Sequence, residues 1–287
     1  MSSTLDEHWF TETFADEGSA FSLEITDKLL DVTSPYQHLE VYATRTYGNL
    51  MVLDGCVMLT ERDNFLYHEM IAHPALFTHR DPRRVVIIGG GDCGTLREVL
   101  RHPGVEQVTQ IDIDEEVTKA AERFFPALTE SNDDPRAELR FADGVKWVEE
   151  APEASIDVLI IDSTDPVGPA EGLFKVDFLA RCQRILKDGG VLVQQSESPL
   201  YHSGSIIREL RRDMREAGFD SVATLPFPQP VYPSGWWSVT LAGKGSSVSD
   251  FRETEAEDLA GLEYYSAAIH RGALSLPPFM RRQLGDG

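Results

Sequence analysis

The chain has 287 residues, and its 48 aspartates and glutamates outnumber 26 lysines and arginines, giving a formal net charge of −22. A surface this acidic repels phosphate groups and argues strongly against a nucleic-acid partner. No apolar run is long enough to cross a bilayer, and the acidic amino terminus lacks the apolar segment of a signal peptide. We therefore expect a cytoplasmic protein without a membrane partner, built as one large domain, alone or with a small appendage.

Lysine is scarce relative to arginine, and dense acid with little lysine resembles the composition of salt-adapted proteins. The alternative is that the acidic residues merely confer solubility. The cysteines Cys56, Cys93 and Cys182 lie far apart without metal-ligand spacing, which indicates reduced thiols. The histidines are also scattered, so we expect no metal site.

Residues 1–75 predict a small antiparallel β-sheet domain. Apolar and polar residues alternate along its segments, and the last segment ends in the turn signal Asp54-Gly55. The expected strands are 21–25, 39–44 and 49–53. Residues 67–74 predict a helix that leads towards the rest of the chain.

Residues 76–287 predict a second domain, in which strand and helix signals alternate from Arg84 onwards. The expected strands are 84–89, 106–112, 137–142, 156–162, 190–195, 220–225 and 236–242. The expected helices are 94–102, 115–125, 144–150, 174–186 and 204–217. Such alternation predicts an α/β fold with a doubly wound sheet. The last two strands could pair as a reversed edge, as in class I methyltransferases, and a C-terminal extension follows.

A glycine-rich turn follows the first strand of this second domain. The apolar run 85–88 leads into Gly89-Gly90-Gly91-Asp92, and a helical segment begins near Thr95. Glycines let the backbone turn sharply and approach a ligand closely. Asp112 ends the next strand, about 20 residues later, where an acid takes ribose hydroxyls in nucleotide-type sites. Together the turn and the acid indicate an adenosine-bearing cofactor, although the turn alone would be weak evidence.

Two carboxylates, Asp162 and Asp165, follow the apolar run 158–161 three residues apart. Such a run is typical of a buried parallel strand, and open α/β sheets bind ligands beyond the carboxyl ends of their strands. Paired acids at that position suit a cationic substrate, or a reaction that removes a proton from one. The alternative for Asp162 is a cap of the following loop or helix, and the residues alone leave both interpretations open.

Five segments in this order carry a family resemblance: GGGDCGTLREVLRH, DIDEEV, DGVKWV, DSTDPVGPAEGLF and YPSGWW. With them the chain resembles the spermidine synthase family of aminopropyltransferases from Trp9 to His270. The resemblance implies a Rossmann-like, class I methyltransferase-like domain behind a small N-terminal sheet. It also implies transfer of an aminopropyl group from decarboxylated S-adenosylmethionine to putrescine, giving spermidine and 5′-methylthioadenosine. Decarboxylated S-adenosylmethionine is then a co-substrate, and no separate cofactor is expected.

Several alternatives stay open beside this activity. Agmatine, cadaverine or a longer polyamine could be the acceptor, because the length of the amine channel decides the choice and sequence shows it poorly. A non-catalytic protein that binds adenosyl compounds or polyamines, and a class I methyltransferase, are rivals from other classes. The paired Asp162 and Asp165 speak against both, since a sensor needs no general base and methyltransferases lack the double-aspartate loop.

The resemblance assigns residues to the amine site. Asp162 matches the proton acceptor of the family. The amine-binding positions are Asp92, Asp165, Tyr67, His68 and Tyr232. For Asp92 the alternative is a cap of the helix near Gly94, and for His68 it is a packed structural histidine. Glu197, after the strand 190–195, is an additional candidate that could equally be a solvated loop acid.

The resemblance also assigns a nucleoside site. Its positions are Gln37, Gly89, Gly91, Asp112, Asp143, Gly144 and Pro169. On sequence alone Gln37 would be a surface residue in a turn, and Asp143-Gly144 a common turn dipeptide. Asp112 stands where the family usually has glutamate, and Met58 stands where many members have a glutamine that holds the nucleoside substrate. The family also implies a homodimer or homotetramer, for which the N-terminal sheet offers an edge.

Overall fold

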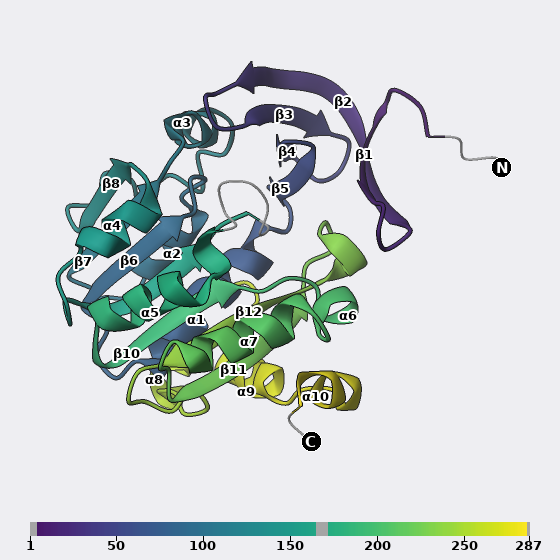
Figure 1. Cartoon of the computed structure of the whole chain (residues 1–287). Helices are drawn as coiled ribbons and strands as arrows, with labels where there is room; N and C mark the ends of the chain where they lie inside the picture. The colour runs from purple at the N-terminus through teal and green to yellow at the C-terminus, as the bar shows by residue number, and fades with distance from the viewer. Residues whose placement is uncertain (1–4, 165–171, 286–287) are drawn as a thin grey trace.

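The computed structural model describes residues 5–164 and 172–285, which form two β-sheets (Figure 1). The smaller sheet is antiparallel, with its strands in chain order. They are β1 (Trp9–Phe14), β2 (Ser19–Thr33), β3 (His38–Thr44), β4 (Asn49–Leu53) and β5 (Cys56–Thr60). The predicted N-terminal sheet is confirmed, with two further strands. Sequence patterning does not reveal β1, because none of its side chains is fully buried. Strand β5 pairs with β4 through the tight turn at Asp54-Gly55.

The larger sheet has the strand order β11-β12-β10-β9-β6-β7-β8. Its strands are β6 (Arg84–Gly89), β7 (Gln107–Asp112), β8 (Ala137–Phe141), β9 (Ile156–Asp162), β10 (Leu186–Gln195), β11 (Ser221–Pro228) and β12 (Trp236–Gly243). The first five are parallel, while β12 runs antiparallel to β10 and β11, so the predicted doubly wound sheet and reversed edge are confirmed. Strand β10 begins four residues before the prediction, because it includes Gly189 and Gly190 in an irregular stretch where its register with β9 shifts.

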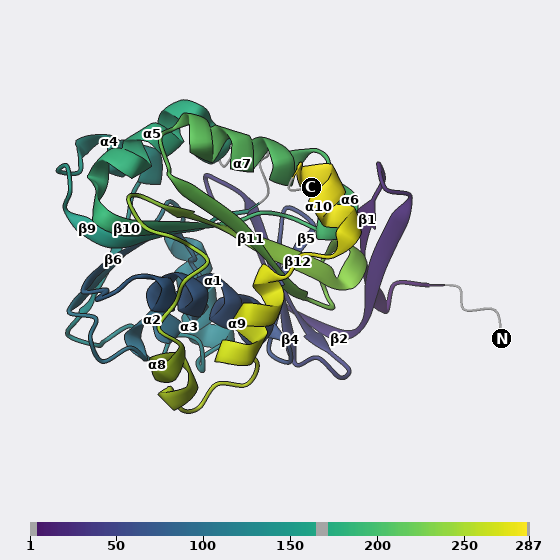
Figure 2. The same ribbon diagram turned by 90° about the horizontal axis from the view of Figure 1, so that it is seen from below.

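Helices cover both faces of the larger sheet (Figure 2). On one face lie α4 (Gly144–Glu150), α5 (Val176–Ile185) and α7 (Ile206–Glu216). On the other lie α1 (Asn64–Thr78), α2 (Gly94–Leu100), α8 (Glu253–Asp258) and α9 (Ala267–Leu274). The remaining helices are α3 (Glu115–Phe124), α6 (Pro199–His202) and α10 (Pro278–Leu284). Every residue of β9 is buried between the two helical layers, as expected for a central parallel strand.

Two apolar clusters join the sheets. Leu39 and Met51 of the small sheet pack with Val117 and Phe125, in and after α3. A second cluster packs Val231, from the loop before β12, against the other side of the small sheet. Helix α1 crosses the predicted division at residue 75 and contributes to the core of the large sheet, so the division stays a prediction. Within residues 5–164 and 172–285, no helix is long and apolar enough to span a membrane.

Candidate active site

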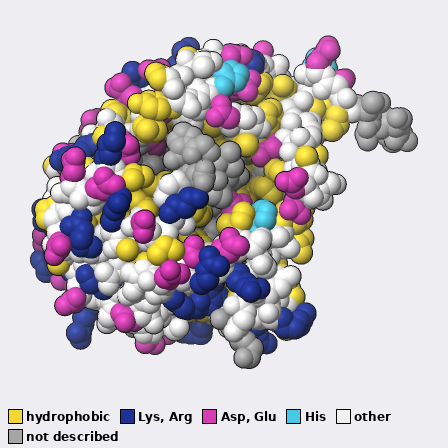
Figure 3. All heavy atoms as spheres, viewed as in Figure 1, with side chains coloured by type: hydrophobic (Ala, Val, Ile, Leu, Met, Phe, Trp, Pro, Cys, Tyr) yellow, Lys and Arg dark blue, Asp and Glu magenta, His cyan; other side chains and the backbone are white. Residues whose placement is uncertain are grey.

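Three aspartates meet at the carboxyl edge of the large sheet. Asp162 and Asp112 end β9 and β7, and Asp92 follows the strand between them, β6. The backbone of Gly89 and Gly90 turns here with positive φ values of 85° and 69°. A side chain on Gly89 would place its Cβ 2.0 Å from the backbone oxygen of Asp162, so only glycine fits beside this aspartate. Figure 3 shows acidic, basic and hydrophobic side chains together on this face of the molecule.

Asp162 is buried and held by two hydroxyl groups from different helices. Tyr67 of α1 donates to Oδ1 and Thr95 of α2 donates to Oδ2, each at 2.6 Å. Burial raises the pKa of the Asp162 carboxyl, and the nearby charge of Asp92 raises it further, while the two hydroxyl hydrogen bonds lower it. A carboxylate whose pKa is raised in this way can accept a proton more readily than an exposed one.

Asp92 does cap the start of α2, since its Oδ1 accepts a 2.7 Å hydrogen bond from the backbone of Gly94. The same oxygen lies 3.1 Å from Nε2 of His68. The imidazole of His68 is buried against Gly94, where a Cβ would lie 2.2 Å from a ring carbon. Burial disfavours the imidazolium, but the charges of Asp92 and Asp162 outweigh it and raise the pKa of His68. A cationic His68 would thus partly balance the two acids.

Asp112 and Gly91 lie side by side at the predicted nucleoside site. A Cβ on Gly91 would lie 2.9 Å from Oδ2 of Asp112, so the glycine leaves room for this carboxylate. Burial raises the pKa of Asp112 to about 6, against a hydrogen bond donated by the backbone of Asp114. Asp112 is therefore a half-buried acceptor that receives a hydrogen bond from the backbone of Asp114.

Gln37 makes a contact that the sequence does not predict. Its side-chain amide donates a 2.9 Å hydrogen bond to Asp114, which also accepts one of 2.6 Å from Ser34 and caps α3. Gln37 is therefore no free surface residue. It ties the small sheet to the helix that follows Asp112.

Asp143 and Gly144 lie at the start of α4. The carboxylate of Asp143 accepts from the backbone amides of Val145 and Lys146. A Cβ on Gly144 would lie 2.5 Å from a methyl group of Ile88, so the helix start packs directly on β6. The other predicted positions in this region, Asp165 and Pro169, lie outside the described residues.

A pocket opens next to Asp162, lined by its hydrogen-bond partner Tyr67 and its chain neighbour Ser163, and takes walls from both sheets. Tyr67, Tyr232 and Trp237 form an aromatic side, with ring centroids 5.8 Å apart for the two tyrosines and 4.9 Å apart for Tyr232 and Trp237. The hydroxyl of Tyr232 donates a 2.5 Å hydrogen bond to the backbone oxygen of Met58. Met58 itself lines the pocket, so its thioether adds apolar surface where a glutamine is usual in the family.

Three functional candidates escape the sequence reasoning: Glu12, Thr95 and Gln195. Glu12, on β1, and Gln195, at the end of β10, both line the pocket. Burial raises the pKa of Glu12 to about 7, although the backbone amide of Val57 donates a hydrogen bond to it. Nothing in the local sequence marks Glu12, because the fold alone brings its strand to the pocket.

Glu197 is buried and has a positive φ of 71°, which is rare for a residue with a side chain. Its Oε2 lies 3.4 Å from Nδ1 of His202, and its Oε1 has no hydrogen-bond partner within the described part of the chain. It is therefore not the solvated loop acid that the sequence allows. The backbone amide of Glu197 also donates to the pocket residue Gln195.

One cluster of metal-ligand types lies away from this edge, on β2 and β3. Asp31, His38 and Glu40 place ligand atoms within 4.8 Å of one another. The ammonium group of Lys28 already bonds both carboxylates there. The cluster is satisfied by this lysine and has no contact with the aspartate edge among the described residues.

The chain matches two family models that together cover most of its length. The spermine/spermidine synthase domain matches residues 64–251, and the spermidine synthase tetramerisation domain matches residues 8–61. A polyamine aminopropyltransferase of Alkalilimnicola ehrlichii is 58% identical over 98% of this chain and 99% of its own. One of Halorhodospira halophila is 59% identical over 96% of this chain and 99% of its own.

Solved structures agree with this. A crystal structure of spermidine synthase in complex with the transition state analogue AdoDATO superposes with a TM-score of 0.93 at 34% identity, covering 100% of this chain and 98% of that one. The Rossmann-like sheet, the small antiparallel sheet and the matched relatives all lead to one assignment. The chain is an aminopropyltransferase that belongs to the spermidine synthase family.

Proposed function

We propose that this enzyme transfers the aminopropyl group of decarboxylated S-adenosylmethionine to putrescine, giving spermidine and 5′-methylthioadenosine. The observation that carries the proposal is the placement of Asp162. Its buried carboxylate is hydrogen-bonded to Tyr67, which lines a pocket that combines an aromatic side with a second carboxylate, Glu12. Such a pocket suits a short chain with an ammonium group at each end.

The acceptor amine must lose a proton before it can react. An alkylammonium has a pKa of about 10.4, so freeing its lone pair at pH 7 costs roughly 4–5 kcal/mol. In our proposal Asp162 accepts this proton. The raised pKa of its carboxyl supports the role, because it brings the pKa of the proton acceptor closer to that of the ammonium that donates the proton.

The freed nitrogen lone pair then attacks the methylene carbon next to the sulfonium. A carbon–nitrogen bond forms as the carbon–sulfur bond breaks, and the bonding electrons pass to sulfur, which leaves as neutral 5′-methylthioadenosine. Tyr67 and Thr95 hold both oxygens of Asp162 in place during this step. Positioning of this kind supplies much of the acceleration in a two-substrate reaction.

The remaining predicted residues hold the two substrates in this proposal. Asp112 accepts from the ribose hydroxyls and Asp143 from the exocyclic amine of adenine, at either end of a nucleoside laid along the sheet edge. Asp92 binds the aminopropyl ammonium or the acceptor amine. That a related spermidine synthase binds the analogue AdoDATO supports an adenosyl co-substrate here.

Tyr232 and Glu12 complete the amine site. A cation over an aromatic ring gains about 0.5–2 kcal/mol, and Tyr232 offers such a ring beside Tyr67 in the pocket lining. Glu12 would take the far ammonium of putrescine. These two contacts and Asp162 give the acceptor three points of recognition.

An acceptor screen tests the proposal. The pure protein is incubated with decarboxylated S-adenosylmethionine and, separately, putrescine, agmatine, cadaverine and spermidine, while 5′-methylthioadenosine release is followed and each amine product is identified by mass. We expect putrescine to give spermidine with the highest kcat/KM. A higher kcat/KM with another amine would identify that amine as the acceptor. Silence with all four, despite binding of 5′-methylthioadenosine, would favour the non-catalytic binding protein.

We also propose that the chain assembles as a homotetramer through residues 8–61. The match of this segment to a tetramerisation domain supports an oligomer, and an exposed sheet edge can pair with a second copy. Sedimentation equilibrium at several concentrations separates the tetramer from the homodimer, which is the alternative.

A further inference from the structure

A buried contact between a histidine and a glutamate joins α1 to α2 behind the active site. Nε2 of His73, on α1, lies 3.2 Å from Oε2 of Glu98, on α2. His73 is completely buried and Glu98 is 1% exposed. Since a carboxylate can only accept, His73 donates in this contact. Nδ1 of His73 lies 3.0 Å from His102, which follows α2, so the pair is part of a longer buried chain.

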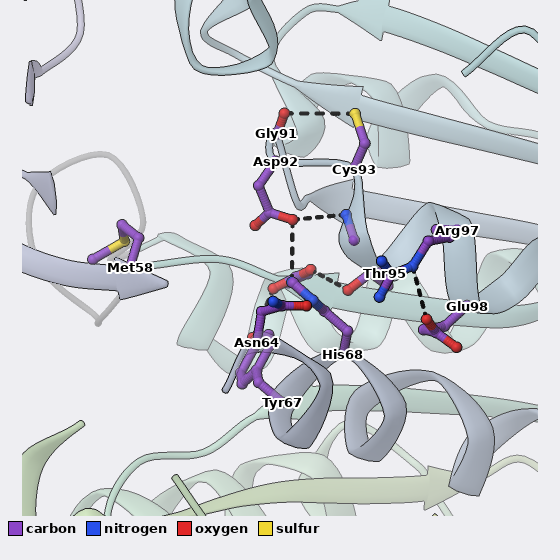
Figure 4. Close-up of polar contacts among 12 residues, drawn as sticks. Met58, Asn64, Tyr67, His68, Gly91, Asp92, Cys93, Thr95, Arg97 and Glu98 are labelled. Carbon is purple, nitrogen blue, oxygen red and sulfur yellow. Dashed lines mark hydrogen bonds and ion pairs between the residues drawn. The ribbon is translucent and has the colours of Figure 1, made fainter. Parts of the chain in front are cut away.

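The same two helices carry the hydroxyl groups that hold Asp162. Tyr67 lies six residues before His73 on α1, and Thr95 lies three residues before Glu98 on α2. Thr95 and Glu98 are therefore one turn apart on the same side of α2. Figure 4 shows α1 and α2 facing each other, with Tyr67 and Thr95 close together and Glu98 further along α2.

Neither helix is well fixed by its own backbone. Helix α2 has seven residues, which is shorter than a helix that is stable alone, and its start is capped by Asp92 rather than by the N-cap residue Cys93. Helix α1 contains Pro74, directly after His73, and a proline inside a helix removes one backbone hydrogen bond. The contact between His73 and Glu98 thus lies where both helices depend on tertiary contacts for their orientation.

Charged groups surround this contact and keep Glu98 ionised. Arg97 of α2 and Arg101, directly after α2, reach its two oxygens at 2.9 and 2.7 Å. Burial alone would raise the pKa of Glu98, but His73 and the two arginines outweigh it and lower the pKa to about 2. His102 lies on the Nδ1 side of His73. Burial lowers the pKa of His102 to about 2, with further lowering by the charges of His73 and Arg252, so this imidazole is neutral.

We propose that Glu98 and His73 are positioning residues of the transfer reaction: their buried contact sets α1 against α2 and thereby aims the hydroxyls of Tyr67 and Thr95 at Asp162. The inference rests on the proposed role of Asp162 as proton acceptor. Neither Glu98 nor His73 hydrogen-bonds Asp162, so both act through the helices. A misplacement of about 1 Å can lower turnover 100-fold, so a contact one turn from Thr95 on α2 and six residues from Tyr67 on α1 is close enough to matter.

The test is a double-mutant cycle between the two layers. One variant is Glu98→Gln, a second is Tyr67→Phe with Thr95→Val, and a third combines them. Turnover is expressed per site that binds 5′-methylthioadenosine, so that unfolded protein does not count. We expect Glu98→Gln to lower kcat by about 10- to 100-fold in the natural chain. In the variant with Tyr67→Phe and Thr95→Val, the same Glu98→Gln change should lower kcat by less than about threefold, because the hydroxyls that Glu98 helps to position are already absent.

A second readout separates positioning from general stability. The hydroxyl hydrogen bonds lower the pKa of Asp162, so their misplacement raises it. Glu98→Gln should therefore move the acidic limb of the kcat/KM profile towards higher pH, in the same direction as the hydroxyl-free variant. Glu98→Asp, which keeps the charge, should restore part of the turnover that Glu98→Gln loses.

Asp157→Asn is the matched control. Asp157 is 5% exposed and bonds Lys187 at 2.7 Å, at the opposite end of the strand that carries Asp162. It should lower the melting temperature while kcat per site and the pH profile stay unchanged. If Glu98→Gln does not fold, His73→Gln replaces it in the same cycle.

Equal losses from Glu98→Gln in both backgrounds would overturn the inference, as would a lower melting temperature with normal kcat per site. Wild-type turnover in the hydroxyl-free variant would also overturn it, because no hydroxyl would then need aiming. Failure of the proposed function itself is seen separately, as the absence of product from every amine with the natural chain.

Discussion

The hydroxyl of Tyr67 donates a 2.6 Å hydrogen bond to Oδ1 of Asp162, across 95 residues of sequence and between a helix and a strand end. The second oxygen of Asp162 accepts a hydrogen bond from Thr95, so two helices hold this carboxylate in one orientation.

Replacement of Asp162 tests the proton-acceptor role directly. Asp162→Asn nearly preserves size, and its amide oxygen can still accept from Tyr67, so the site should keep its shape. An amide cannot take the proton of an ammonium at neutral pH, so kcat should fall by about 10²- to 10⁴-fold. Steady-state release of 5′-methylthioadenosine measures this, with its binding affinity as the control, expected within about threefold. Near-normal turnover would contradict the assignment.

Two substitutions at Tyr232 separate its ring from its hydroxyl. Tyr232→Phe loses the hydrogen bond to Met58 and should destabilise the fold by about 1 kcal/mol while leaving the amine KM nearly unchanged. Tyr232→Leu also removes the aromatic face and should weaken amine binding by about 0.5–2 kcal/mol, a roughly 2- to 30-fold rise in KM. Equal effects of both variants on KM would show that the ring does not bind the cation.

The pKa of Glu12, raised to about 7 by burial, predicts a pH dependence of amine binding. As pH rises through 7 the carboxyl loses its proton, and the resulting charge attracts an ammonium. The acceptor stays protonated over this range, since its pKa is near 10. The amine KM should therefore fall between pH 6 and pH 8. In Glu12→Gln it should be higher and independent of pH, and a parallel decline in that variant would assign the effect to another group.

Asp112 makes a separate prediction for the nucleoside. Its pKa, raised to about 6 by burial, means that the carboxylate becomes a full hydrogen-bond acceptor as pH rises through 6. Ribose hydroxyls form stronger hydrogen bonds to the carboxylate than to the protonated acid, so 5′-methylthioadenosine should bind more tightly at pH 7 than at pH 5. Isothermal titration measures this, and the dependence should flatten in Asp112→Asn. Affinity that is constant in the natural chain would exclude Asp112 from the ribose contact.

The net charge of −22 predicts stabilisation by salt. Like charges on the surface repel one another, and the screening length falls from about 10 Å at 0.1 M salt to about 3 Å at 1 M. The melting temperature should therefore rise between these concentrations. A neutral osmolyte at matched osmolarity controls for effects unrelated to charge. A flat melting temperature would leave the acidic residues a role in solubility alone.

The strands of the large sheet are predictable because their sequences are buried on both faces. The apolar run 158–161 has no polar interruption, and its strand ends at Asp162 in agreement with the prediction. Helix α1 is longer than the predicted 67–74, since its remaining turns contain Asn64, Phe65 and Thr78 without a clear pattern. Strand β1 stays hidden because only half-buried side chains mark it.

The site is less predictable than the sheet. Gly91, Asp92 and Asp112 follow strands in a known order, so topology alone brings them to one edge. Thr95 is an ordinary first-turn residue of a helix in the sequence, and only the approach of α2 to β9 makes it a partner of Asp162, 67 residues away. The sequence does not predict the place of Glu12 in the pocket either, because that place depends on how the two sheets pack together.

The pocket walls come from residues 12, 58, 67 and 232, and the bond from Tyr232 to Met58 spans 174 residues. No single contiguous segment of the chain supplies enough of these walls to form the pocket. A chain emerging from the ribosome therefore holds no complete amine site until its last quarter has been synthesised and docked. In refolding, too, turnover should be among the last properties to return, after the helical signal of the large domain, because contacts so distant in sequence form slowly.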